Sequence, residues 1–238
     1  MAMKGITGAK NIFDESEVGF FNLYHAGCDR EVLLGDLGQK FEMYDMGFKP
    51  YPCCRLNHRF IDAVIKFVKD NKMKTEELEE LNVSVCKGVY EVLCTPLQEK
   101  KEPKSIMAAQ FSLPWTLACG VVRQKVGIRE FSEEGLRDPA LLKVAAKVNP
   151  ILDAALPDEH AFSKIQFKTK NEAFEIMTNY PRGSIENPMG FDDLGHKLMD
   201  CASIASMRIS DENLARVITM VMNLEHVDRV DEIMHLLV

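Results

Sequence analysis

Apolar residues recur at helical spacing directly after the most reactive stretch of the chain, residues 48–58. There Ile61, Val64, Ile65 and Val68 lie three or four positions apart, which is the spacing of one helix face. This pattern predicts a helix with a buried face. It is preceded by a rigid, non-helical run, because the two prolines of that run each fix φ and disfavour helix in the residue before.

The same spacing predicts three helices toward the C-terminus, over residues 191–207, 211–224 and 227–237. The middle segment carries an apolar stripe typical of an amphipathic helix. Its members are Leu214, Val217, Ile218, Val221 and Met222.

Two further helices are predicted in the middle of the chain. One is strongly apolar and runs through Val126, with Ser112 as its cap and Pro114 in its first turn. The other begins at Asp138-Pro139 and runs to about Val148.

Alternating apolar and polar positions predict a small number of strands. We expect a short strand over 41–48, a strand over 81–93 with either a bulge or a close backbone approach at Gly88, and a hairpin over 161–180. The charged segment 98–104 is expected to be an exposed loop. Because the strands are few and partly adjacent in sequence, the pattern favours an α+β fold over a doubly wound sheet.

Composition narrows the classes of partner. Apolar residues make up 46% of the 238 residues, which is enough for a core, and the formal net charge is −7. An acidic balance argues against a nucleic-acid partner, for which a basic face is expected. A local cluster of Lys and Arg can still bind an anionic small molecule.

The seven cysteines are scattered, with no C-x-x-C pair and no zinc-like spacing. Reduced thiols in the cytoplasm are the simplest interpretation. No apolar signal-peptide core follows Met1, and no apolar run reaches the length of a membrane span. We therefore expect no membrane association and no zinc site.

The stretch 48–58 holds the first candidate groups. Lys49 is either a solvated surface charge or a general acid or base whose pKa is lowered by Phe48 and Arg55. Cys54 and His58, four residues apart, could form a thiolate–imidazolium pair or supply two metal ligands, or His58 could be buried or orienting.

Two more features remain open at this level. Trp115, the only tryptophan, is either a core aromatic or a pocket wall with an N–H donor. The loop 183–190 is either a turn or a site where backbone N–H groups and Asn187 meet a carboxylate at the following helix.

Four motifs in order resemble the MmgE/PrpD family, which contains 2-methylcitrate dehydratase, cis-aconitate decarboxylase and iminodisuccinate epimerase. The first is the run Lys49–Cys54 (KPYPCC) with His58, and the second is Ala109–Trp115 (AQFSLPW). The others are the loop from Gly183 through Asn187-Pro188-Met189 ahead of LGHKL at 194–198, and GITG at residues 5–8.

The resemblance covers nearly the whole chain but only the C-terminal half of the family's usual sequence. It implies an α+β lid domain over residues 50–185. The flanks, 1–49 and 186–238, would then belong to an incomplete all-helical domain.

The resemblance also implies a cofactor-independent lyase or isomerase. Such enzymes move a proton next to a carboxylate of a small di- or tricarboxylate, giving dehydration, decarboxylation or epimerisation. Lys49 and His58 match catalytic positions of the family. Cys54, Arg55, Trp115 and Asn187 are expected to bind substrate.

The family's remaining site residues lie in its N-terminal half. The resemblance therefore implies a partner chain carrying that half, and exposed apolar stripes on residues 1–40 and 191–238 that favour a homo-oligomer. The alternative is a non-catalytic remnant that binds carboxylates or mediates oligomerisation.

Overall fold

A computed structural model describes residues 1–14, 17–25 and 27–237 of the chain. It divides into two units, Met1–Met46 and Gly47–Val238, which are treated separately below. The second unit carries the sheet, the core and all of the candidate site residues.

The first unit consists of short helices joined by turns. Its α-helices are α1 (Phe20–Tyr24) and α2 (Arg30–Gly35), and Asp29 caps α2 by accepting from two backbone N–H groups. Aromatic rings of Phe13, Phe20 and Phe21 meet one another at centroid distances of 5.6–5.9 Å. No large apolar side chain described in this unit is buried, so the unit has no core of its own.

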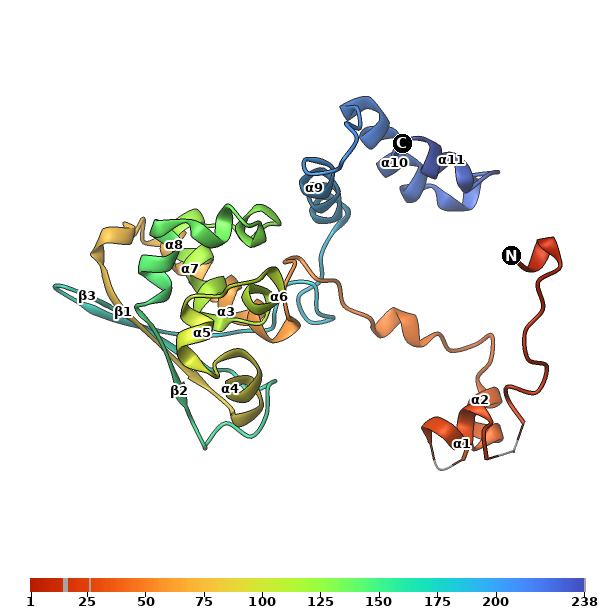
Figure 1. Ribbon diagram of the computed structural model, residues 1–238, viewed down its shortest axis with the longest axis horizontal. Helices are drawn as coiled ribbons and strands as arrows, with labels where there is room; N and C mark the ends of the chain where they lie inside the picture. Colours follow the sequence, from red (N-terminus) through yellow and green to blue (C-terminus); the bar gives the residue numbers. More distant parts are fainter. Residues whose placement is uncertain (15–16, 26, 238) are drawn as a thin grey trace. The chain divides into compact units, whose positions relative to one another are not determined.

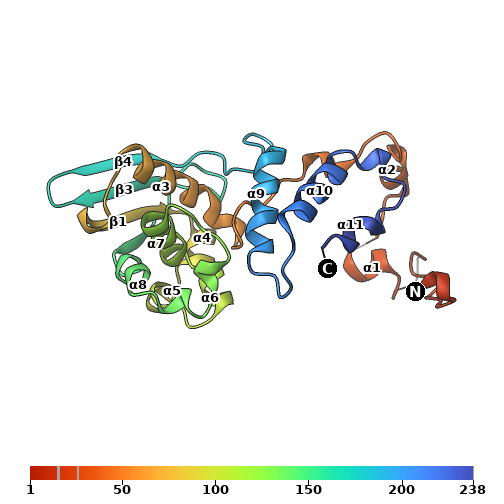
Figure 2. The same ribbon diagram turned by 90° about the horizontal axis from the view of Figure 1, so that it is seen from above.

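The second unit is built on one mixed sheet with the strand order β2-β1-β3-β4. The strands are β1 (Leu78–Val85), β2 (Val148–Leu152), β3 (Lys164–Thr169) and β4 (Ala173–Met177). β1 pairs with β2 in parallel and with β3 in antiparallel register, and β3 and β4 form a hairpin. Figure 2 shows this hairpin projecting at one end of the sheet.

Helices cover the apolar face of the sheet. α3 (His58–Asp70) lays Phe67 on Phe167 of β3, with ring centroids 4.1 Å apart. α7 (Leu113–Arg123) packs beside α3, where Gly120 allows close approach to Val64. The core is continuous because these apolar side chains meet those of β1.

Shorter helices complete this layer, and Figure 1 shows them grouped near α7 and β1. They are α4 (Lys87–Leu93), α5 (Leu97–Lys101), α6 (Ile106–Gln110) and α8 (Pro139–Ala145).

The opposite face of the sheet is polar. Asn82 of β1 donates to Gln166 of β3 and accepts from Asn149 of β2, so side-chain amides link three neighbouring strands. Lys168 pairs with Glu80 across β3 and β1 at 2.8 Å. One buried and one polar face give a two-layer α+β architecture, which confirms the fold class expected from the sequence.

Three element predictions are wrong. Residues 41–48 contain a 3₁₀ helix, Glu42–Asp45, because this exposed segment has no neighbouring strand. The strand predicted over 81–93 ends at Val85, and the chain continues as α4, which contains Gly88 and buries Val89. The charged segment 98–104 begins inside helix α5 rather than forming a loop throughout.

Strand β2 was missed, because the helix ending at Ala145 was expected to continue to Val148. Pro150 sits in β2, where it is tolerated because β2 lies at the edge of the sheet.

Three helices follow the loop 181–190: α9 (Phe191–Ala202), α10 (Asp211–Met222) and α11 (Asp231–His235). They confirm the three predicted helices, each shorter than expected. Leu214 and Val217 of α10 are buried, whereas Val221 and Met222 of the same stripe are exposed. No helix in the described part of the chain combines the length and apolarity needed to cross a membrane.

Candidate functional site

The stretch 48–58 is held in a non-helical path until α3 begins. Cys53 donates its backbone N–H to Tyr51, and a single 3₁₀ turn, Arg55–Asn57, leads into His58 at the start of α3. Cys54 lies before the helix and His58 is its first residue, so the two do not share a helix face. Sharing a face would have required the helix to begin at or before Cys54.

A pocket of about 340 Å³ lies on this stretch. Its lining residues are Lys49, Tyr51, Pro52, Cys53, Cys54, Gln110, Phe111 and Lys197. The pocket thus brings together the stretch, the end of α6 and helix α9.

Backbone and amide contacts fix the α6 side of the pocket. Gln110 donates from its side chain to the carbonyl of Pro52 at 2.9 Å. The Gln110 carbonyl in turn accepts from the backbone of Cys54 at 3.0 Å and from Asn57 Nδ2 at 3.2 Å. The end of α6 is therefore bound directly to the motif that carries Lys49.

Helix α9 contributes Lys197 to the pocket lining. Asp193, Lys197 and Asp200 lie four and three residues apart, so they occupy neighbouring positions on one face of the helix. Lys197 Nζ donates to the Lys49 carbonyl at 2.9 Å, and Asp200 pairs with Lys125 at 2.7 Å. Two lysines, Lys49 and Lys197, therefore line one pocket.

His58 is fully buried beneath the stretch. Its Nδ1 lies 3.4 Å from Arg55 Nη1 and its Nε2 lies 3.4 Å from the Cys53 carbonyl. A guanidinium can only donate and a carbonyl can only accept, so these contacts fit a neutral ring protonated on Nε2. Burial, followed by the charge of Arg55, lowers the pKa of His58 to about 3. His58 is thus neutral at physiological pH and does not line the pocket.

The two cysteines of the motif differ in exposure. Cys53 is buried, and burial raises the pKa of its thiol to about 12. A thiol with that pKa is unreactive at neutral pH, because the thiolate is the nucleophile. Cys54 is partly exposed in the pocket wall.

Arg55 turns away from the pocket. Its Nη1 donates to the carbonyls of Phe48 and Arg182 at 3.2 and 3.0 Å. Arg55 therefore braces two backbone segments, and the structure does not bring it to the pocket lined by Lys49.

Trp115 and Asn187 also lie outside the pocket lining. Trp115 is 0% exposed, and its Nε1 donates to the carbonyl of Glu130 at 3.3 Å. Of the two alternatives for this residue, its position is that of a core aromatic. Asn187 donates to the Tyr180 carbonyl at 3.1 Å and so closes the loop 181–190 on itself.

The start of α9 is not free to bind a carboxylate. Asp192 and Asp193 occupy its first turn, Asp193 accepts from the Gly190 backbone at 3.2 Å, and Asp193 also pairs with Arg182. These carboxylates already use the positive end of the helix dipole.

Sequence reasoning missed Gln110, Phe111 and Lys197 as pocket residues. Each lies inside a motif that was identified, AQFSLPW or LGHKL. Nothing in the local sequence indicated that these two motifs meet the stretch 48–58 in space.

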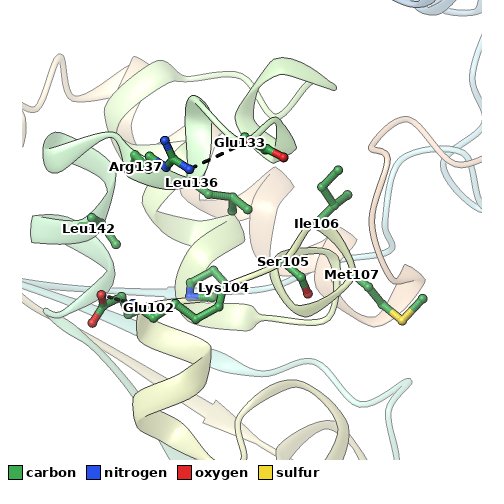
Figure 3. Close-up of a pocket in the computed structure, with 10 residues that line it drawn as sticks. Glu102, Lys104, Ser105, Ile106, Met107, Glu133, Leu136, Arg137 and Leu142 are labelled. Carbon is green, nitrogen blue, oxygen red and sulfur yellow. Dashed lines mark hydrogen bonds and ion pairs between the residues drawn. The ribbon is translucent and has the colours of Figure 1, made fainter.

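A second hollow, of about 840 Å³, lies elsewhere on the unit (Figure 3). Its charged residues form pairs with one another, Lys104 with Glu102 and Arg137 with Glu133. Among the described residues, no group of three or more His, Cys, Asp or Glu side chains could hold a metal ion. Of these two hollows, the Lys49 pocket is the stronger candidate for carboxylate chemistry, because two lysines and no acidic residue line it.

Comparison with known proteins agrees with the motifs. Residues 51–225 match the MmgE/PrpD C-terminal domain. The chain is similar to a cis-aconitate decarboxylase of Aspergillus terreus (strain NIH 2624 / FGSC A1156), with 25% identity over an alignment of 257 residues. A second cis-aconitate decarboxylase from Aspergillus terreus is 24% identical over the same length.

In both comparisons the alignment covers 100% of this chain and 51% of the relative, so the chain spans about half the length of these curated relatives. The family match includes the pocket residues from Tyr51 to Lys197, with Lys49 two residues before its start. The chain therefore belongs to the MmgE/PrpD family, and residues 51–225 are its C-terminal domain.

Proposed function

We propose that this chain is the C-terminal portion of a cofactor-independent lyase or isomerase acting on small di- or tricarboxylates. The observation that carries this proposal is that Lys49 and Lys197 both line one pocket. Two ammonium groups at one site match a substrate with two or more carboxylates. The relatives' name, cis-aconitate decarboxylase, supports a tricarboxylate.

Lys49 is the residue proposed to act on the substrate. Its side chain is exposed at the pocket, while its backbone is held by Lys197. Its ammonium pairs with a carboxylate and stabilises the negative charge that develops when a proton leaves the neighbouring carbon. Lys49 can also move that proton, as a general acid or base.

The other predicted residues take supporting roles. The neutral, buried His58 orients the stretch through Arg55 and the Cys53 carbonyl rather than meeting the substrate. Cys54 forms part of the pocket wall, so its side chain affects which substrate fits.

We further propose that a helical half on a partner chain completes the site, and that copies of this chain also associate as a homo-oligomer. The exposed apolar side chains of α9 and α10, including Phe191, Val221 and Met222, support such a partner. The free cysteines support a reducing compartment such as the cytoplasm.

The alternative function is a non-catalytic module that binds carboxylates or mediates oligomerisation. Carboxylate binding by such a module would use the same two pocket lysines, and oligomerisation would use the exposed apolar side chains of α10. An adjacent reading frame encoding a helical half would favour the enzyme over this module.

The experiment that separates the two is turnover. The chain is mixed with a helical-half protein of the same family, and 2-methylcitrate, citrate and cis-aconitate are assayed by absorbance of the unsaturated acid. We expect turnover of one of them, lost in Lys49→Ala. Absence of turnover, or full activity in Lys49→Ala, would contradict the enzymatic proposal.

A further inference from the structure

Two backbone segments approach unusually closely next to Lys49. Phe48 donates its N–H to the Gly183 carbonyl at 2.7 Å. A Cβ on Gly183 would lie well inside contact distance of the Phe48 carbonyl, and a Cβ on Gly47 would do the same to the Gly183 carbonyl. Gly183 also has φ +81°, a conformation that favours glycine. Both positions therefore require glycine for the segments to meet.

Asp62 of α3 joins the same two segments through its two carboxylate oxygens. Tyr51 donates its hydroxyl to Oδ1 at 2.6 Å, and Arg182 donates its backbone N–H to Oδ2 at 2.8 Å. One oxygen thus holds the stretch that carries Lys49, and the other holds the loop 181–190. Hydrogen bonds to a charged group are the stronger class.

Arg55 donates to the carbonyls of Phe48 and Arg182, which belong to the same two segments. We name Gly47, Phe48, Arg55, Asp62, Arg182 and Gly183 the clasp.

The clasp holds the backbone before Lys49, and its Asp62 also holds the side chain of Tyr51 after Lys49. Phe48, immediately before it, is bound through its N–H and its carbonyl, and Tyr51, two residues after it, is bound through its hydroxyl. The clasp also reaches α9, because Arg182 pairs with Asp193. Lys197, four residues after Asp193 on α9, donates a hydrogen bond to the Lys49 carbonyl.

We propose that Asp62 is a positioning residue that, through the clasp, sets where the Lys49 side chain stands in its pocket. Asp62 does not line the pocket, so it acts through the backbone of the stretch and the loop rather than on a ligand. The effect on ligand binding rests on the proposed carboxylate function, whereas the effect on the backbone does not.

The test uses the full chain with Asp62→Leu, Asp62→Asn and Tyr51→Phe. Amide hydrogen exchange is followed at Phe48 and Gly183, with Leu81 and Val83 of β1 as internal references. We expect Asp62→Leu to speed exchange at Phe48 roughly tenfold while exchange in β1 is unchanged. Without the Asp62 hydrogen bonds, the segment around Phe48 opens locally while the sheet stays folded. Tyr51→Phe keeps the loop contact, and Asp62→Asn keeps one acceptor, so both should show smaller increases. Unchanged exchange at Phe48 in all three variants would overturn the proposal.

Citrate affinity supplies the second readout. We expect Asp62→Asn to weaken citrate binding in the parent chain and to have no further effect in the Lys49→Met background, because Asp62 acts through Lys49. An equal loss in both backgrounds would reveal a merely structural role and overturn the proposal. If the parent chain binds no citrate, the proposed function fails, and hydrogen exchange alone decides the positioning role.

Discussion

His58 and Asp62 illustrate how burial sets the protonation of individual residues at this site. His58 is held neutral by burial and by the neighbouring charge of Arg55. Burial raises the pKa of Asp62, although Tyr51 and the Arg182 backbone oppose this by hydrogen bonding to the carboxylate. Burial and the Asp62 carboxylate also raise the pKa of Tyr51 well above its ordinary value. These groups make stability depend on pH.

The pH dependence of stability should carry the signature of His58. Its folded pKa of about 3 lies below the ordinary value of 6.5, so between these values the unfolded chain binds the extra proton. Stability contributed by neutral His58 is present above about pH 6.5 and is lost as pH falls, with a slope of at most about 1.4 kcal/mol per pH unit.

Urea unfolding of the parent chain and of His58→Gln between pH 7 and pH 4.5 measures this slope. The raised pKa of Asp62 acts in the opposite direction, but it is common to both proteins. The variant should therefore show a shallower loss of stability toward acid pH. Parallel curves for the two proteins would contradict the assignment of a neutral His58.

Gly183→Ala should destabilise the chain by at least about 2 kcal/mol, because Ala is disfavoured at positive φ and its Cβ would overlap the Phe48 carbonyl. Gly88→Ala is the matched control. Gly88 lies in helix α4 with nothing near its Cβ position, so this change should be neutral or stabilising by up to about 1 kcal/mol. Equal free energies of unfolding for the two variants, measured in urea, would count against the close approach at Gly183.

The sequence could indicate the reactive stretch and single out Lys49 and Cys54 as pocket residues, because both lie in one local motif. It could not separate them from Arg55, which belongs to the same motif but donates to backbone carbonyls, one of them 127 residues away in sequence. Nor could it exclude Trp115, because an apolar helix start looks the same whether it lines a core or a pocket.

At the scale of elements, helix caps and the spacing of apolar residues predicted helices and strands correctly where neighbouring residues alone determine the structure. α3, α7 and the β3–β4 hairpin follow their predicted patterns. The boundary between β1 and α4 could not be read, because Val89 and Val92 continue the β-branched composition of the strand. The sequence did not predict β2, because its pairing with β1 is a long-range contact and because Pro150 argues locally against a strand.

Ser112 offers a test of the element that places the second motif. Ser112 is buried, and its hydroxyl accepts from the Trp115 N–H at 3.0 Å and donates to the Lys100 carbonyl. Ser112→Ala should therefore cost about 1–2 kcal/mol of stability. Ser105 caps the short helix α6 at an exposed position and is the matched control.

Chemical denaturation of Ser112→Ala and Ser105→Ala compares the two caps directly. We expect the larger loss at Ser112, because its removal also takes this donor from the Lys100 carbonyl in a part-buried contact. A larger loss at Ser105 would contradict the importance of the buried cap.

For the whole molecule, the unit Gly47–Val238 has a continuous core, but its last helices present apolar side chains to solvent. Patches of this kind mark interaction surfaces. The exposed apolar side chains of these helices lead us to expect association.

Association should therefore depend on α10. We expect the parent chain to self-associate at micromolar concentration in light scattering, and Val221→Lys with Met222→Lys to shift it toward monomer. Ile106→Lys with Met107→Lys adds the same charge at exposed positions of α6 and should have little effect. A monodisperse parent monomer would be evidence against association through this surface.

The central claim, that the Lys49 pocket binds a polycarboxylate, is tested most directly by calorimetry on the full chain. The parent, Lys49→Met and Lys66→Met are titrated with cis-aconitate and citrate at low salt. Lys66 is the control because it lies on α3 with its charge in solvent, paired with Asp70. We predict binding by the parent and Lys66→Met and a loss of roughly tenfold or more in Lys49→Met, because a charge-assisted contact is removed. Absence of binding, or equal affinity in Lys49→Met and the parent, would contradict it.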